Sequence, residues 1–459
     1  MIRLFNHYFR RQLLIQVGCD LSVIALVILA VYGVLVRQGD HHVVPATQGL
    51  SLLAGLLVIN TASGLYRPAR GRSLNHARIR AALALVLALL LSYAVFGILP
   101  PEVESREELR WLTMLGVAGV VAHRVRAGLG ERATKPLSRI LIFGAGASAQ
   151  LVARSISLAN PQVRIVGFIP GPNEPPSIVD ASQLLSGPGS LKDRAIALGV
   201  DEIVVALSDR RGGAMPLREL LDCKIVGVQV SDLSTYFEKM LGQIRIDQLH
   251  AGWLIFGNGF DHSVFRDIAK RAFDIACSSL LLVMAAPILF VTALCIRLES
   301  KGPVLYRQER VGQDGRTFSV LKFRSMRVDA EKNGAPQWAV AKDDRVTRVG
   351  SVIRRFRIDE FPQLLNVLKG EMSLVGPRPE RPFFVDQLTV DIPFYAVRHS
   401  VKPGVTGWAQ VRYQYGASVE DSLQKLQYDL YYVKNHSLFL DVVVLFETVG
   451  VVVSGKGAR

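Results

Sequence analysis

The sequence contains little cysteine and no recognisable motif for a metal bound by cysteine or histidine. Its four cysteines have apolar neighbours and no CxxC spacing, so we interpret them as reduced core or membrane residues. The nine histidines form neither an HxxxH nor an HExxH pattern. There is also no internal repeat and no low-complexity tract. These absences argue against a disulfide framework and against a zinc site.

Acidic residues are outnumbered. The chain of 459 residues has 54 Lys and Arg against 39 Asp and Glu, a formal charge of +15, yet half of it is hydrophobic and its mean hydropathy is +0.28. Such a basic and apolar composition is typical of a protein held against anionic lipid, or of one that handles phosphates. Positive-inside topology accounts for part of the excess. We expect membrane lipids as partners and no nucleic acid.

Long hydrophobic runs are concentrated near the N-terminus. The first and third of them are long and nearly uncharged, as a helix that crosses a bilayer requires. The first run is too long for a cleaved signal peptide and lacks a cleavage motif. Four apolar segments lie at Leu13–Val36, Thr47–Tyr66, Ala81–Leu99 and Leu109–Ala122.

The charges between these segments predict their orientation. Arginines precede the first segment, separate the second from the third and follow the fourth, whereas acids gather between the third and the fourth, as at Glu107 and Glu108. By the positive-inside rule, both ends of a four-helix unit are cytoplasmic.

A strand, a glycine-rich turn and a helix open the next region. Ile140–Phe143 leads into Gly144-Ala145-Gly146-Ala147-Ser148-Ala149, a match to the dinucleotide fingerprint GxGxxG/A. The acid that usually holds the ribose is missing, because the second strand ends in Phe168-Ile169-Pro170-Gly171. We therefore favour an accessory Rossmann-like domain over a bound dinucleotide. The further strands are predicted at Val163–Ile169, Glu202–Ala206 and Ile225–Val230.

A second kind of apolar segment follows. Ile275–Ile296 carries no charge and is long enough to span, but Lys270 and Arg271 precede it and further basic residues follow it. Pro287 lies in its middle, where it removes a backbone hydrogen bond. A re-entrant helix over residues 272–298 that enters from the cytoplasmic face, breaks at Pro287 and returns satisfies both basic flanks. The later apolar run Phe439–Val453 is interpreted as an interfacial or buried helix.

An adjacent pair of carboxylates is the strongest chemical signal. Asp359 and Glu360 precede Pro362, which suits the first turn of a helix, and Gly370 suits its end. A helix N-terminus favours negative charge, so simple capping is one interpretation. Arginines around the pair, including Arg354, favour a site in which one carboxylate attacks phosphorus while the other holds Mg²⁺.

Cations elsewhere complete a candidate phosphate site. Prolines flank Arg378 and present its guanidinium on a rigid backbone, and Arg381 follows in the same run. Lys322 and Arg324 alternate along a predicted strand, a pattern that a solvated strand face also produces.

These motifs resemble those of bacterial polyprenyl-phosphate glycosyl-1-phosphate transferases of the monotopic kind. The N-terminal prefix resembles, by architecture, the long subclass that initiates exopolysaccharide or O-antigen assembly. The matching motifs are Lys270-Arg271-Ala272-Phe273-Asp274, Gly302-Pro303-Val304, Lys322-Phe323-Arg324-Ser325-Met326, Asp359-Glu360, Gly376-Pro377-Arg378-Pro379, Lys402-Pro403-Gly404-Val405-Thr406-Gly407-Trp408-Ala409-Gln410-Val411 and Asp429-Leu430-Tyr431-Tyr432-Val433-Lys434.

The resemblance implies roles for several of these residues. It implies a re-entrant anchor, Asp359 as the phosphorus nucleophile with Glu360 in the Mg²⁺ site, Arg354 and Arg378 at substrate phosphates, and Asp429 as a further active-site acid. It also implies a UDP-sugar and undecaprenyl phosphate as substrates and makes a homodimer plausible. One departure affects sugar specificity: where many relatives read Asn-Gly-Arg, this chain has Arg412-Tyr413-Gln414, so that only Arg412 is left to replace their arginine.

The expected architecture is a membrane α-helical N-terminal bundle, an α/β Rossmann-like domain and a mixed α/β catalytic domain anchored by a re-entrant membrane helix. The boundaries are 1–135, 136–250 and 270–459, with a linker at 251–269. We expect a multi-pass protein of the bacterial cytoplasmic membrane whose catalytic domain faces the cytoplasm. Two alternatives stay open: an NAD-dependent sugar-nucleotide dehydratase or epimerase, and a polytopic transporter or scaffold. The scarcity of polar residues in the apolar segments argues against a solute pathway.

Overall fold

The computed structural model describes two compact units. The middle unit comprises residues 130–257, and the main unit comprises residues 1–129 together with 258–459. Each unit is described by itself. The described residues are 138–159, 163–171, 174, 178–185, 187, 189–207, 215–246, 259–260, 263–327, 345–413 and 418–453, with scattered positions before residue 123.

Little of the N-terminal region is described. A short antiparallel pair joins β1 (Ile2–Leu4) to β2 (His7–Phe9). Residues 14–22 and 84–91 are helical, which agrees with the first and third predicted spans, but most of the four-helix bundle lies outside the described residues. His7 is buried, and a hydrogen bond of 2.6 Å joins its Nδ1 to the hydroxyl of Tyr431 in the C-terminal part of the same unit.

The middle unit is built on a parallel four-stranded sheet in the order β4-β3-β5-β6. Three predicted strands coincide with β3, β4 and β5 to within two residues. The fourth begins later than predicted, because Ile225 still belongs to a helix. The strands are β3 (Ser138–Phe143), β4 (Val163–Ile169), β5 (Glu202–Val205) and β6 (Gln229–Asp232).

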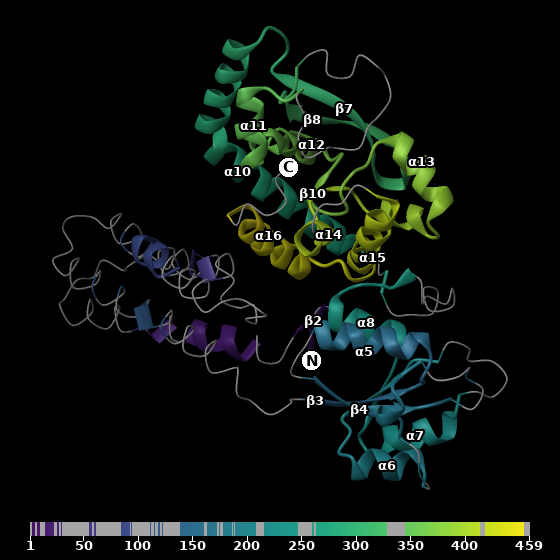
Figure 1. The fold of residues 1–459 in the computed structure, drawn as a ribbon. Helices are drawn as coiled ribbons and strands as arrows, with labels where there is room; N and C mark the ends of the chain where they lie inside the picture. The colour runs from purple at the N-terminus through teal and green to yellow at the C-terminus, as the bar shows by residue number, and fades with distance from the viewer. Residues whose placement is uncertain are drawn as a thin grey trace. The chain divides into compact units, whose positions relative to one another are not determined.

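Helices cover both faces of this sheet, as Figure 1 shows. One core cluster packs α5 and α8 against one face, and a second packs α6 and α7 against the other. This is a doubly wound arrangement. The helices are α5 (Ala147–Ala159), α6 (Leu191–Ala197), α7 (Leu217–Ile225) and α8 (Leu233–Leu241), with the short η2 (Ala181–Gln183).

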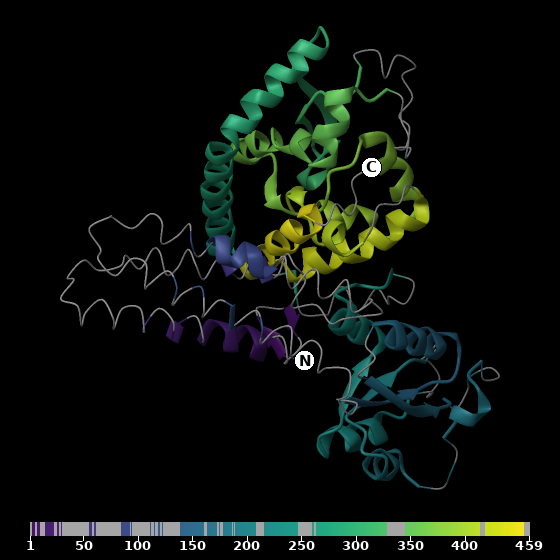
Figure 2. The same ribbon diagram turned by 60° about the vertical axis from the view of Figure 1, so that its left-hand side comes forward.

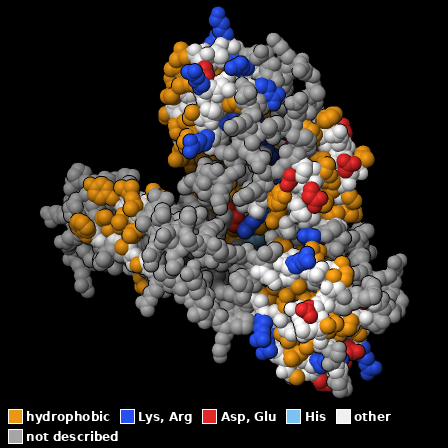
Figure 3. Space-filling model, viewed as in Figure 1, with side chains coloured by type: hydrophobic (Ala, Val, Ile, Leu, Met, Phe, Trp, Pro, Cys, Tyr) orange, Lys and Arg blue, Asp and Glu red, His pale blue; other side chains and the backbone are white. Residues whose placement is uncertain are grey.

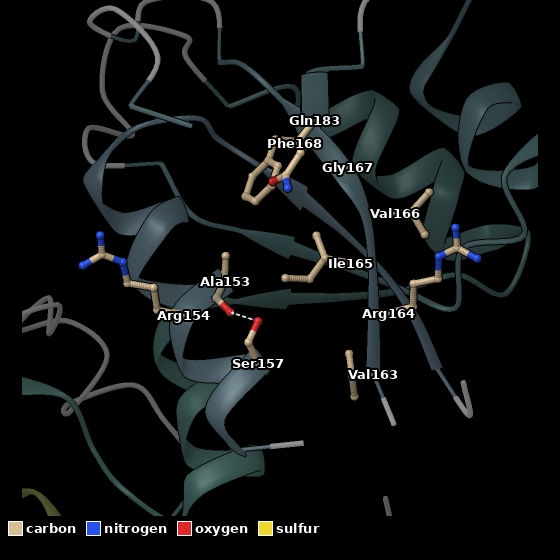
Figure 4. Close-up of a pocket in the computed structure, with 10 residues that line it drawn as sticks. All are labelled: Ala153, Arg154, Ser157, Val163, Arg164, Ile165, Val166, Gly167, Phe168 and Gln183. Carbon is tan, nitrogen blue, oxygen red and sulfur yellow. Dashed lines mark hydrogen bonds between the residues drawn. The ribbon is translucent and has the colours of Figure 1, made fainter. Parts of the chain in front are cut away.

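A cavity of about 740 Å³ lies beside α5 and β4. In Figure 4 its charged lining residues, Arg154 and Arg164, lie at opposite sides, and the hydroxyl of Ser157 bonds the backbone of Ala153. Among its described lining residues there is no acid, histidine or cysteine. The remaining lining residues are Val163, Ile165, Val166, Gly167, Phe168 and Gln183.

The C-terminal part of the main unit is a mixed α/β domain (Figures 1 and 2). Its strands form an antiparallel hairpin, β7 with β8, and a short parallel pair, β9 with β10. In chain order it contains α10 (Val264–Glu299), β7 (Leu305–Val311), η4 (Gln313–Gly315), β8 (Thr317–Phe323), α11 (Arg348–Arg355), η5 (Ile358–Glu360), α12 (Gln363–Lys369), β9 (Ser373–Val375), α13 (Pro382–Asp391), η6 (Tyr395–Ser400), β10 (Gly404–Thr406), α14 (Trp408–Arg412), α15 (Val419–Asn435) and α16 (Leu438–Val453).

Helix α10 is long and apolar enough to cross a membrane, the only helix in the described part of the chain that is. It begins before the predicted segment and continues through Pro287 without interruption; Figure 2 shows it changing direction part-way along its length. Its middle exposes large apolar side chains, among them Val283 at 74%, Met284 at 69% and Phe290 at 73%. Figure 3 shows an apolar band along this helix.

Both ends of α10 attach to the same domain. Near the start, Lys270 Nζ lies 2.6 Å from Asp441 Oδ2 on α16, and Arg271 donates to the carbonyls of Val367 and Leu368 at the end of α12. The predicted basic flank is therefore also structural, because cations suit the carbonyl end of a helix. Near the other end, Ile296 packs in a buried cluster with Phe323 and Ile353.

A buried amide joins α12 to β8. Asn366 is fully buried; its Oδ1 accepts from the amide of Leu321 at 3.0 Å and its Nδ2 donates to the carbonyl of Ser319 at 2.8 Å. Because buried polar groups keep such partners, the start of α12 is fixed beside the hairpin. The turn η5, which runs directly into α12, therefore lies next to β8.

Candidate active site

The two predicted carboxylates lie on the turn η5, between α11 and α12. Arg357 separates α11 from η5 with φ at +60°, a left-handed conformation that is uncommon for a residue with a side chain. Gly370 ends α12 with φ at +90°, as its position in the sequence predicted. The reversal at Arg357 turns Asp359 and Glu360 toward β8 and its Lys322, whose charge acts on both.

Glu360 is held by arginines. Its Oε1 accepts a hydrogen bond from Arg378 Nη2 at 2.8 Å, and its Oε2 lies 3.6 Å from Arg357 Nη1. Burial opposes ionisation, but Arg378, Lys322 and Arg357 outweigh it and lower the pKa of Glu360 to about 2. This side chain is a fixed negative charge at any physiological pH.

Asp359 has the opposite environment. Among the described residues, its buried Oδ1 has no hydrogen-bond partner. Burial, and then the neighbouring charge of Glu360, raise the pKa of Asp359 to about 6, although Lys322, Arg354 and Arg378 act to lower it. A carboxylate with this pKa is mostly ionised at pH 7 and is more basic than an ordinary aspartate. These are the properties of a nucleophile or a general base.

The surrounding cations come from separate elements. Lys322 lies on β8, Arg354 lies in the last turn of α11, and Arg378 follows β9. Burial lowers the pKa of Lys322 to about 8, against the attraction of Glu360, so this lysine is still charged at pH 7. The structure thus brings together the carboxylate pair and three of the predicted phosphate-binding cations. The pattern in the sequence identified all of them.

Asp429 reaches the site only through an intermediate residue, Arg398. It is 2% exposed on α15, and its Oδ2 accepts from Arg398 Nη2 at 2.8 Å and from Arg398 Nε at 3.1 Å. Arg398 in turn donates to the backbone carbonyl of Arg378 at 2.9 Å. The sequence analysis missed Arg398. A signal for it existed, since Asp429 directly precedes the apolar run from Leu430 to Val433, and a buried aspartate requires a cationic partner.

Two other predicted phosphate ligands have different surroundings. Arg324 is 6% exposed, and its guanidinium donates to the carbonyls of Ser300 and Lys301 just after α10. These contacts make it a cap for the anchor helix and leave little of it for a substrate. Arg381 is the N-cap residue of α13.

Of the two carboxylates in the site, Asp359 is the better suited to bind Mg²⁺. Among the described residues no group of three or more Asp, Glu, His or Cys side chains gathers. Mg²⁺ needs only one or two protein carboxylates when substrate phosphates complete its shell. Asp359 Oδ1 has the free lone pairs for this task, whereas both oxygens of Glu360 face arginines.

The chain was then compared with known proteins. The model of the family described as bacterial sugar transferase matches residues 265–455. A UDP-glucose:undecaprenyl-phosphate glucose-1-phosphate transferase of Caulobacter vibrioides is 45% identical over 187 residues, which are 40% of this chain and 69% of that relative. This chain belongs to the bacterial sugar transferase family.

Two further relatives differ in the share of their length that this chain covers. A UDP-N-acetylgalactosamine-undecaprenyl-phosphate N-acetylgalactosaminephosphotransferase of Aeromonas hydrophila is 44% identical over 263 residues, 57% of this chain but only 61% of that relative. An exopolysaccharide production protein of Rhizobium leguminosarum is 42% identical over 200 residues, 41% of this chain and 98% of that protein. The chain thus spans less than two thirds of the Aeromonas relative, and the names of the Aeromonas and Caulobacter relatives differ in the sugar.

The sugar transferase match contains every residue of the candidate site and leaves the middle unit out. Within it, Arg412, the residue left to replace the relatives' arginine, contacts an acid and an aromatic ring of the same domain. Its Nη2 lies 2.7 Å from Glu447 Oε1, and its guanidinium carbon lies 4.2 Å from the ring centre of Trp408. These two contacts hold it against α16 and α14.

Proposed function

We propose that this sugar transferase moves a sugar-1-phosphate from a UDP-sugar to undecaprenyl phosphate and releases UMP, as the first membrane step of exopolysaccharide or O-antigen assembly. The observation that carries the proposal is the environment of Asp359: a buried carboxylate with an unpartnered oxygen, a raised pKa and cations on several sides. Such a group suits attack on an anionic phosphorus, because the cations screen the repulsion between the reactants.

The reaction proceeds in two displacements. A carboxylate oxygen of Asp359 attacks the phosphorus that bears the sugar, a phosphorus–oxygen bond of the diphosphate breaks, and UMP leaves with the electron pair. An oxygen of the lipid phosphate then attacks the same phosphorus and displaces the Asp359 carboxylate, which regenerates the enzyme. Splitting the transfer keeps the two anionic substrates from meeting directly at one phosphorus.

The other residues supply charge and orientation. Arg378 and Lys322 neutralise phosphate oxygens while Glu360 holds Arg378 in place by its 2.8 Å hydrogen bond. Mg²⁺, held by the Asp359–Glu360 pair together with the substrate diphosphate, would supply Lewis-acid neutralisation of the leaving phosphate.

The surface of α10 supports a membrane anchor that enters and leaves on one side. Its two ends contact one folded domain, through Lys270 and Arg271 at one end and Ile296 at the other. Its exposed apolar middle suits lipid. The contact between His7 and Tyr431 supports an even number of crossings between them, since both lie on one side of the membrane. A cytoplasmic catalytic face and a homodimer stay predictions.

A labelling experiment tests this anchor. Cysteines that replace the exposed Asp267 and Lys301 should both react from the cytoplasm; Lys301 is preferable to Ser300, whose hydroxyl bonds Arg324. Pro287→Leu should straighten α10 and move position 301 toward the other side. Labelling of position 301 from the periplasm in the unaltered helix would contradict the re-entrant anchor.

The function itself is tested by a burst assay with purified protein. Mixing the enzyme with a panel of UDP-sugars, without lipid, should release about one UMP per active site for the correct sugar. Adding undecaprenyl phosphate should start turnover with ping-pong kinetics. Intersecting initial-rate lines without a burst would indicate direct displacement by the lipid phosphate instead.

A further inference from the structure

A buried ion pair stands directly behind the candidate site. Asp429 and Arg398 are 2% and 5% exposed and lie 2.8 Å apart, on α15 and η6. Taking two charges out of water is costly, and a single buried carboxylate or guanidinium without its partner costs more still. Neither group is positioned to contact a solvent-borne substrate.

Every nitrogen of the Arg398 guanidinium is engaged. Nε and Nη2 donate to Asp429, Nη1 donates to the hydroxyl of Tyr395 at 2.8 Å, and Nη2 also donates to the carbonyl of Arg378 at 2.9 Å. The ring of Tyr395 packs against the guanidinium, with its centre 5.1 Å from the central carbon. A planar group fixed at so many points has one orientation.

The carbonyl that Arg398 binds belongs to the residue whose side chain meets Glu360. Pro377 and Pro379 restrict the backbone on either side of Arg378. Fixing the Arg378 carbonyl therefore also fixes the direction in which its side chain leaves the backbone. That side chain ends 2.8 Å from Glu360 Oε1.

We infer that Arg398, locked by Asp429, is a positioning residue that holds the Arg378 guanidinium at the carboxylate pair. The inference rests on the proposed function, because Arg378 is the group assigned to the substrate phosphates. The inference also gives Asp429 a role that a buried acid can have. Asp429 orients Arg398, and Arg398 in turn positions Arg378, whereas Asp429 does not itself bind phosphate.

Arg398→Lys is the first test. An ammonium keeps the charge beside Asp429 but does not reach Asp429, Tyr395 and the Arg378 carbonyl together. We expect kcat/KM to fall about 10- to 100-fold, as for small displacements of a positioning group. Binding of inorganic pyrophosphate should weaken in parallel, because Arg378 is the group assigned to the substrate phosphates.

A matched control comes from the middle unit. Glu202 is 5% exposed and forms a buried ion pair with Lys239 at 2.9 Å. Glu202→Gln should lower thermal stability, as the loss of any buried pair does, but leave kcat/KM and the affinity for inorganic pyrophosphate unchanged. An Arg398→Lys variant whose stability falls while its affinity for pyrophosphate stays fixed would reduce Arg398 to a structural residue.

A double-mutant cycle sharpens the distinction. If Arg398 acts through the Arg378 side chain, adding Arg398→Lys to Arg378→Gln should cost less than a further twofold in kcat/KM. If the two losses multiply, Arg398 acts independently and the inference is wrong. Should Arg398→Lys fold poorly, Arg398→Gln with Asp429→Asn removes both charges and leaves neither buried alone, and the same cycle applies.

The UMP burst of the unaltered enzyme distinguishes a failure of this inference from a failure of the proposed function. Absence of a UMP burst with every UDP-sugar would count against the proposed function. A normal burst with multiplying losses would count only against the positioning role. The same double-mutant cycle can be measured without turnover by calorimetric titration with inorganic pyrophosphate. Arg398→Lys should weaken pyrophosphate binding when Arg378 is present and should leave it unchanged in the Arg378→Gln background.

Discussion

The two units of this protein each direct an acid toward groups that attract anions, with opposite results. In the middle unit, Glu174 Oε2 accepts from the amides of Ala145 at 2.6 Å and Gly171 at 3.1 Å. The acid of the chain itself thus occupies the glycine-rich turn, where a dinucleotide pyrophosphate would bind. In the main unit, no residue in the described part of the chain donates a hydrogen bond to the buried Oδ1 of Asp359.

This difference separates structural from chemical use of a carboxylate. Glu174 Oε1 is also buried without a partner among the described residues, but the two amides that donate to Glu174 Oε2 hold the turn together. A buried carboxylate oxygen without a donor costs stability and persists where chemistry needs it. Gly144, with φ at +130°, approaches the Ala206 carbonyl so closely that an added Cβ would lie 2.7 Å from its oxygen. The turn is therefore compact as well as occupied, and this argues against the NAD-dependent alternative.

The largest effect should follow from exchanging the nucleophile. Asp359→Asn should lower transfer by at least about 10³-fold and abolish the UMP burst, because an amide is a poor nucleophile. Glu174→Gln, the matched acid-to-amide change in the middle unit, should leave kcat and KM within about twofold. The UMP burst and the steady-state rate should be measured for both variants. Near-normal transfer by Asp359→Asn would contradict the proposed mechanism.

Glu360→Gln should have the next largest effect. The amide keeps the shape but loses the charge that binds Arg378 and Arg357, so transfer should fall about 10²- to 10³-fold. The rate should also respond more weakly to Mg²⁺, which a magnesium titration measures. An unchanged magnesium dependence would mean that Glu360 only orients arginines.

The pH dependence should show a single acid limb near pH 6. Asp359 attacks as the carboxylate, and its pKa is raised to about 6, so the rate should fall about tenfold per unit as the pH drops below that value. The pH dependence of the burst rate measures this limb. A limb near pH 4 would mean that the carboxylate is less buried in solution.

The same shift predicts a gain in stability. A carboxyl group whose pKa is higher in the folded than in the unfolded state binds protons more tightly when folded, so it destabilises the fold above about pH 6. Asp359→Asn should therefore raise the melting temperature at pH 7, by the equivalent of about 1–3 kcal/mol. The gain should shrink as the pH falls through 6 toward 4, whereas a gain independent of pH would point to another cause.

The smallest effect concerns the middle unit. Glu174→Ala leaves the amides of Ala145 and Gly171 without their acceptor and should lower the stability of this unit by about 1–3 kcal/mol. Inorganic pyrophosphate should raise the melting temperature of this variant more than that of the unaltered protein, where it binds only at the candidate active site. Equal stabilisation of both would show that removing Glu174 opens no anion site at the turn.

The sequence predicted those parts of the site that depend on local order. The Asp359–Glu360 pair, the rigid Arg378 loop and the Gly370 stop lie within one short stretch, so spacing and turn chemistry identify them. The strands β3 and β4 were equally local, since buried strands and glycine turns have strong patterns.

Contacts between residues that are far apart in the chain could not be predicted from the sequence pattern. Arg324 looked like a phosphate ligand because its strand alternates cations, yet its partners are carbonyls beyond the hairpin, at Ser300 and Lys301. Arg398 and Asp429 are 31 residues apart, and Glu174 lies 29 residues from Ala145. Which distant groups meet depends on packing, which a single sequence does not specify.

The bond between His7 and Tyr431 has a consequence for how the protein is made. The two residues are 424 positions apart, so β2 is synthesised long before its partner on α15 exists. Closure of this contact is therefore a late event in biogenesis.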